Sequence, residues 1–141
     1  MTTLDKPRVL IADGDHRRNA RLRRLMTDNG YAVVAAVKNG DEAVTGAKWL
    51  RPDLILLGLD LEGEIDGVAA AEEISITTST PIMILDEIGF NRRALRKAPE
   101  VAGFLPRTAD DRTVLTMAGS LAYRSICSLE GSEWECKQVA V

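Results

Sequence analysis

The sequence has few cysteines and no long apolar run, and each shortage excludes a class of protein. Cys127 and Cys136 are too few for the disulfide framework of a small secreted protein, and their spacing matches no zinc motif. No apolar stretch approaches the ~20 residues that span a bilayer, and residues 1–8 lack the apolar core of a signal peptide. We therefore expect a cytoplasmic protein that does not bind membranes.

The sequence also has no large excess of positive or negative charge. The net charge of −3 over 141 residues gives no global attraction to nucleic acid or anionic lipid, and no nucleic-acid partner is expected. With 45% hydrophobic residues, a chain of this length can bury a hydrophobic core that is stable without disulfides or a structural metal ion. We expect one folded domain over residues 1–128 and a short polar C-terminal tail over residues 129–141.

Short apolar runs alternate with longer amphipathic stretches, which is the pattern of a parallel β-sheet with crossover helices. Several runs are continuously apolar, as expected for strands covered by helices on both faces. The expected strands are Val9–Ala12, Ala32–Val37, Leu54–Leu57, Ile82–Leu85 and Ala102–Leu105. The sequence predicts an α/β fold: a five-stranded parallel sheet, doubly wound and flavodoxin-like, in the order 2-1-3-4-5, with sites beyond the carboxyl ends of the strands.

Five helices are expected between and after these strands. Asp15 can cap the first helix, which stops near Asn29-Gly30. The remaining helices are expected to begin near Gly40-Asp41 and Asp66-Gly67, and to cover Phe90–Lys97 and Asp110–Ser128.

The stretch RPDLILLGLDLEGEIDG, residues 51–67, resembles the third strand and following loop of bacterial response-regulator receiver domains, the CheY-like family. The segments RVLIADGD, PIMIL and GFLPR follow the same family in order and spacing, so that the resemblance covers roughly residues 7–128. In that family the residue at Gly58 is the aspartate that accepts a phosphoryl group. Glycine has no side chain, and the chain therefore resembles a degenerate receiver, or pseudo-receiver.

Aspartyl phosphorylation needs a carboxylate nucleophile, a cation and donors for the phosphoryl oxygens. The resemblance places Asp13 and Gly14 at the acidic pair that helps to hold magnesium, so that one carboxylate is missing. Asp86 replaces a hydroxyl residue, and like charges ~4 Å apart repel by about 4 kcal/mol at an effective dielectric of 20. We expect a pocket with no catalytic residue, no bound metal and no cofactor.

Arg107 and Asp86 are expected to form an ion pair in this pocket. They follow neighbouring strands, ~4.8 Å apart across the sheet, within reach of a guanidinium group. Asp13 is a further candidate partner of Arg107, which stands at the lysine position of the family. Phe104, three residues before Arg107, stands for the aromatic switch residue of receivers.

The leading functional prediction is an atypical receiver that acts in two-component signal transduction, or in a phosphorelay, through phosphorylation-independent protein–protein interaction and not as an enzyme. Two alternatives stay open. The domain could still be phosphorylated at Asp60 or Asp13, although the side chain at 60 would lie ~6.6 Å beyond that at 58 along a strand. It could also sense a small anion at the crevice near Asp13, Asp86 and Arg107.

Two basic clusters are the candidate interaction surfaces. The first helix carries Arg17, Arg18, Arg21, Arg23 and Arg24, and the expected fourth helix carries Arg92, Arg93, Arg96 and Lys97. In receivers the first helix docks on a histidine kinase or phosphotransfer protein, and the face formed by helix 4, strand 5 and helix 5 forms dimers or contacts output proteins. The resemblance therefore implies a signalling protein partner and a homodimer, in which Arg112 and Arg124 extend the second basic surface and Asp110 and Asp111 are candidate partners across the dimer.

Overall fold

The computed structural model describes residues 6–86 and 97–130. Side chains are described for residues 6–86 and 97–123. These residues form one parallel sheet in the order β2-β1-β3-β4-β5, which confirms the predicted topology. The strands are β1 (Arg8–Ala12), β2 (Ala32–Val37), β3 (Leu54–Gly58), β4 (Ile82–Asp86) and β5 (Val101–Pro106). Each observed end lies within one residue of its prediction, because every strand is a nearly continuous apolar run.

Four helices lie in the described part of the chain: α1 (His16–Asp28), α2 (Gly40–Leu50), α3 (Gly67–Thr77) and α4 (Asp111–Glu130). The last of these corresponds to the predicted final helix and runs two residues past Ser128. The five predicted helices are therefore four in the described residues, because the predicted helix over Phe90–Lys97 lies outside them except for Lys97. No helix of the described ranges is both long enough and apolar enough to cross a membrane.

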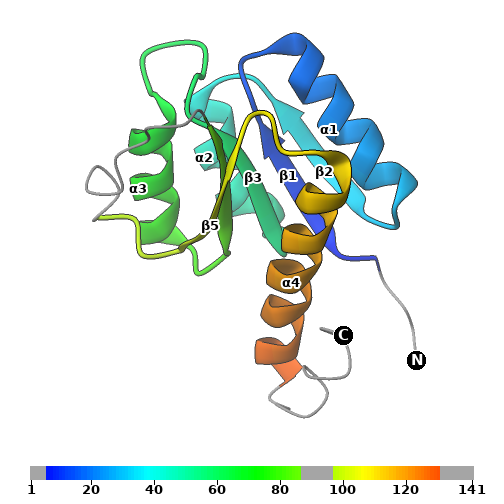
Figure 1. The fold of residues 1–141 in the computed structure, drawn as a ribbon. Helices are drawn as coiled ribbons and strands as arrows, with labels where there is room; N and C mark the ends of the chain where they lie inside the picture. The colour runs from blue at the N-terminus through cyan, green and yellow to red at the C-terminus, as the bar shows by residue number, and fades with distance from the viewer. Residues whose placement is uncertain (1–5, 87–96, 131–141) are drawn as a thin grey trace.

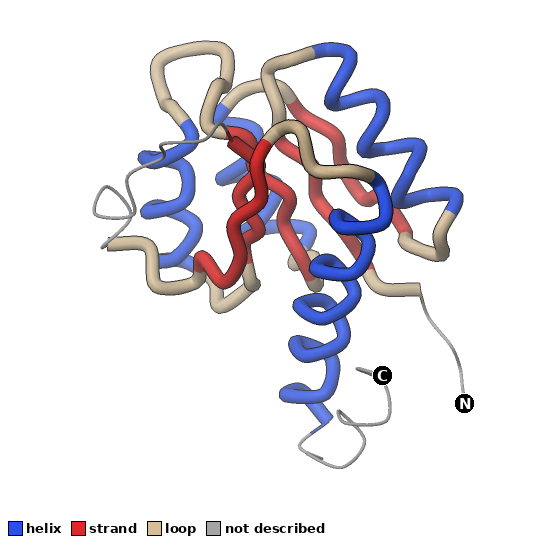
Figure 2. The backbone as a smooth tube through the Cα atoms, viewed as in Figure 1, coloured by secondary structure: helices blue, strands red, loops and turns tan. Residues whose placement is uncertain are grey.

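The helices cover both faces of the sheet, α1 and α4 on one and α2 and α3 on the other (Figures 1 and 2). Alternate side chains of each strand enter the two cores. In β1, Val9 and Ile11 pack with α1 and α4, whereas Leu10 and Ala12 pack with α2 and α3. Both faces of the central strands are therefore dry, and polar groups are confined to the strand ends.

The predicted helix boundaries at α1 are confirmed by the capping contacts. The Asp15 side chain accepts hydrogen bonds from the backbone N–H groups of Arg17 and Arg18, at 2.9 and 3.0 Å. Asn29 caps the other end, and Gly30 follows with φ +91°, a conformation that glycine adopts without strain. The cap fixes which turn of α1 faces the carboxyl end of β1.

Asn19 joins α1 to the two strands beneath it. Its buried side-chain amide donates to the backbone carbonyls of Asp13 (3.0 Å) and Val37 (2.8 Å), at the carboxyl ends of β1 and β2. The backbone N–H of Asp13 also donates to Val37 O, at 3.0 Å. One side chain therefore holds together the edge of the sheet where polar residues gather.

Replacing Asn19 with alanine should lower the free energy of unfolding by about 2 kcal/mol, because two carbonyl groups lose a buried donor. Urea denaturation of the wild type and N19A measures the difference. Asn29→Ala is the control, since Asn29 also donates to a carbonyl, Leu25 O at 2.8 Å, but is exposed. Equal losses in the two variants would contradict a special role for Asn19.

Candidate functional site: the carboxyl edge of the sheet

The carboxyl ends of the central strands bring together the residues that the sequence singles out. Asp13 directly follows β1, Gly58 ends β3, Asp86 ends β4 and Arg107 directly follows β5. Gly58 is buried and in register with Leu85 of β4. Strand β3 therefore has no side chain at the position where the resemblance expects a nucleophile. A Cβ added at Gly58 would lie 3.2 Å from Cγ and Oδ2 of the Asp13 carboxylate.

Asp13 is 1% exposed and is held by Arg18 from the first turn of α1. Arg18 Nη2 donates to Asp13 Oδ1 at 2.8 Å, and Arg18 Nε donates to Oδ2. The backbone N–H of Asp15 also donates to Asp13 Oδ1, at 2.9 Å. Both carboxylate oxygens are thus bound by the two-pronged fork that gives the strongest arginine–carboxylate contacts.

The charge of Asp13 also acts on Arg18. Burial lowers the pKa of the Arg18 guanidinium, but the hydrogen bonds and charge of Asp13, aided by Asp15 and Asp60, outweigh it and raise the pKa above its ordinary value. Arg18 is therefore a permanent cation in this site.

Gly14 allows the loop after β3 to close over the strand ends. Its backbone N–H donates to the carbonyl oxygen of Asp60 at 3.0 Å. A Cβ at Gly14 would overlap that oxygen and lie 3.3 Å from the Cα of Leu61, so a larger residue requires the loop to move. Further along, Glu62 N–H donates to Lys38 O at 2.9 Å, which anchors the loop beside the end of β2. In this chain the loop backbone fills the space where the second carboxylate of the acidic pair would stand.

The predicted ion pair between Arg107 and Asp86 is present. Arg107 Nη2 and Nε lie 2.9 and 3.1 Å from Asp86 Oδ1, and Nη2 also lies 3.4 Å from Asp60 Oδ2. The backbone supports the pair, since Arg107 N–H donates to Asp86 O at 3.0 Å. The carboxylate of Asp13, the other expected partner, is bound by Arg18.

The contact between Arg18 and Asp13 was not predicted from the sequence, because an arginine side chain on a basic helix is expected to point into solvent. The available signal was the cap: once Asp15 is the N-cap, residue 18 lies three positions on and can reach back past the helix terminus.

The comparisons with known proteins agree with this geometry. Residues 9–116 match the family model of the response regulator receiver domain. The chain belongs to this family. It is 30% identical over 129 residues to the transcriptional regulatory protein PdtaR of Mycobacterium tuberculosis, an alignment that covers 88% of this chain and 62% of PdtaR. The chain thus spans less than two thirds of that relative.

Solved receiver structures share the fold. The signal receiver domain of a modulated diguanylate cyclase from Desulfovibrio desulfuricans superposes with a TM-score of 0.75 at 28% identity, covering 88% of this chain and 99% of that one. The receiver domain of an HD domain-containing protein from Pseudomonas fluorescens gives a TM-score of 0.79 at 19% identity, covering 92% and 96%. The chain is therefore a receiver domain of the kind used in two-component signalling.

The basic face of this receiver domain lies on α1. Arg17, Arg21 and Arg24 are exposed there, and Arg21 Nη2 pairs with Asp111 Oδ1 of α4 at 2.6 Å. Together with the start of α4 they line a groove of about 770 Å³. The second basic cluster lies outside the described residues except for Lys97; its other members are Arg92, Arg93 and Arg96.

The acidic residues at the start of α4 are engaged within the chain. Asp110 accepts from Thr113 N–H at 2.8 Å, and Asp111 pairs with Arg21. Their role as partners across a dimer stays a prediction. Phe104 is partly buried, packed with the core on the α2–α3 side. No group of three histidine, cysteine or acidic side chains suited to a metal ion occurs among the described residues.

Restoring an aspartate at position 58 should destabilise the domain. Gly58→Asp adds a second carboxylate against buried Asp13, whose charged partner Arg18 is already engaged, and should cost about 2–4 kcal/mol of unfolding free energy. Gly58→Asn, of the same size without the charge, should cost clearly less. Urea denaturation of both variants at neutral pH separates charge from size. Equal losses would mean that crowding, not charge, governs this position.

Proposed function

We propose that this receiver domain acts in signal transduction by phosphorylation-independent protein–protein interaction. The observation that carries the proposal is the end of β3: Gly58 supplies no nucleophile, and the neighbouring carboxylate of Asp13 already has both oxygens bound by Arg18. A phosphoryl group therefore has neither an acceptor at the usual position nor an unoccupied place beside it.

Asp60 is a poor substitute for the missing aspartate. Its side chain is 79% exposed and contacts Arg107, while its carbonyl oxygen accepts from Gly14. An effective phosphoacceptor needs a cation and donors arranged around it before the reaction. These contacts favour the pseudo-receiver over a receiver with a shifted acceptor.

A small-anion sensor is also disfavoured by the charges in the crevice. Four carboxylates (Asp13, Asp15, Asp60 and Asp86) surround two guanidinium groups, and each guanidinium contacts two of them. An incoming anion would have to displace carboxylates that are already attached to the protein. A structural role for the two arginines therefore fits these contacts better.

Incubation with a small acyl phosphate and magnesium should add no phosphoryl group to the protein, as judged by intact mass. The same treatment of a receiver with an intact aspartate is the positive control. A gain of one phosphoryl group that disappears in Asp60→Asn, or in Asp13→Asn, would overturn the proposal and restore phosphotransfer through that carboxylate.

The surface proposed for a signalling partner is the groove along α1. It carries several arginines, and among the described residues neither Arg17 nor Arg24 makes an ion pair, so the face is positive and open. A partner with acidic side chains would be attracted and oriented by this charge. Membership of the receiver family supports a signalling protein as the partner.

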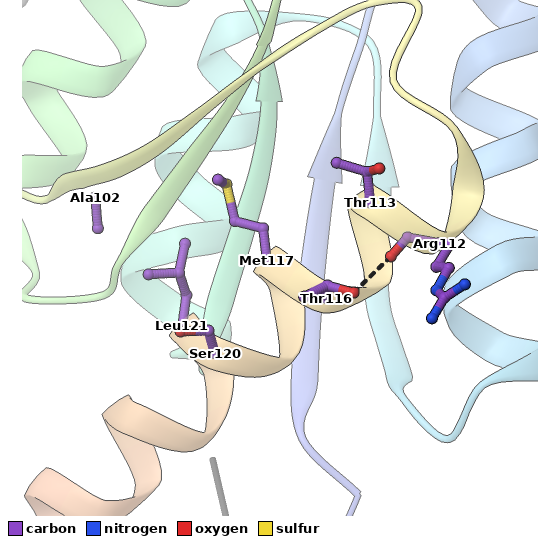
Figure 3. Close-up of a pocket in the computed structure, with 7 residues that line it drawn as sticks. All are labelled: Ala102, Arg112, Thr113, Thr116, Met117, Ser120 and Leu121. Carbon is purple, nitrogen blue, oxygen red and sulfur yellow. Dashed lines mark hydrogen bonds between the residues drawn. The ribbon is translucent and has the colours of Figure 1, made fainter. Parts of the chain in front are cut away.

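The surface proposed for a homodimer is the edge of the sheet at β5 together with α4. A groove of about 520 Å³ lies there, lined by Ala102, Arg112, Thr113, Thr116, Met117, Ser120 and Leu121. In Figure 3, Met117 and Leu121 project from α4 toward the side on which Ala102 of β5 lies. The edge strand and these apolar side chains offer a surface that a second copy can cover.

Ala102→Arg should abolish this dimer, because Ala102 is exposed and a long cationic side chain would occupy the groove. Sedimentation over a range of concentrations should show a dimer for the wild type and a monomer for A102R. Ile76→Arg is the control, since Ile76 is 76% exposed on α3, on the opposite face of the sheet. A wild-type chain that stays monomeric throughout would contradict the dimer.

A further inference from the structure

Asp13 is the one charged side chain that is buried among the residues the structure describes. A buried carboxylate is strongly destabilising unless an opposite charge accompanies it. Here the opposite charge comes from within the chain, because Arg18 binds both oxygens. The pocket thus contains its own cation.

Arg18 differs from the other arginines of α1. Its side chain is only 13% exposed, whereas Arg17, Arg21, Arg23 and Arg24 are exposed. It extends back past the helix cap, where Nη1 also lies 4.0 Å from Oδ2 of Asp15. Neighbouring arginines of one helix therefore have separate roles, one turned into the site and the others toward solvent.

We propose that Arg18 is a permanent internal replacement for a divalent cation, and that its pairing with Asp13 holds the first turn of α1, and with it the basic face, in one position. Carboxylate oxygens are ligands that Mg²⁺ prefers, and the guanidinium lies against the carboxylates of Asp13 and Asp15. A planar fork bound to both oxygens of a buried carboxylate excludes that ion. The inference rests on the proposed function and gives the reason why the pocket does not switch.

Removing the internal cation should make the domain dependent on an external one. Arg18→Ala should lower the melting temperature by roughly 10 °C in the presence of chelator, and millimolar Mg²⁺ should restore a clear part of that loss. Sodium chloride at the same ionic strength should not. Arg17→Ala is the matched control, since Arg17 is exposed in the same turn. Addition of Mg²⁺ should leave the melting temperature of this variant unchanged, and likewise that of the wild type.

An R18A variant as stable as the wild type would overturn the inference, and so would one that is destabilised but indifferent to Mg²⁺. If R18A does not fold, the double variant D13N/R18A decides, because a neutral amide at 13 needs no counter-ion. A double variant about as stable as D13N alone supports the inference, and one as unfolded as R18A contradicts it. Because no phosphodonor is used, failure here would leave the mass test of the proposed function standing.

Discussion

Burying a carboxylate at the end of a central strand is costly unless an opposite charge accompanies it. Asp13 is in that position, and Arg18 meets the requirement. The contact also sets where α1 begins, because Asp15, the residue between the two partners in the chain, caps the helix and donates its own N–H to Asp13. The start of α1, the end of β1 and the pair of Arg18 with Asp13 therefore depend on one another.

The two glycines of the site lie beside these contacts. At Gly14 a side chain would push away the Asp60 carbonyl, and at Gly58 it would press on the Asp13 carboxylate. Without side chains at these two positions, the loop after β3 can lie on the strand ends, and Arg18 is the charged partner of Asp13. Arg107 completes the closure from the other side, joining Asp86 to Asp60 of that loop.

The strands could be predicted because each is a short, nearly continuous apolar run, rich in Val, Ile and Leu in most cases and separated from the next by an amphipathic stretch. The pair of Arg107 with Asp86 could be predicted too, because the carboxyl ends of two adjacent parallel strands lie side by side. The sequence was not sufficient for Arg18, because whether an arginine of a basic helix turns inward depends on the rotation of α1 about its axis. That rotation depends on the buried amide of Asn19, which reaches the carbonyl of Val37 on another strand, and such a tertiary contact is not visible in the sequence.

A receiver that switches needs two conformations of similar free energy, which a ligand can shift only by binding one better than the other. In this chain the two arginine–carboxylate pairs both favour one arrangement, and neither needs an external ligand to form. On the proposed function, the basic face of α1 is then presented constantly. If the proposed function holds, the pocket does not distinguish two states, and regulation would reside in the amount of the protein and in competition among its partners.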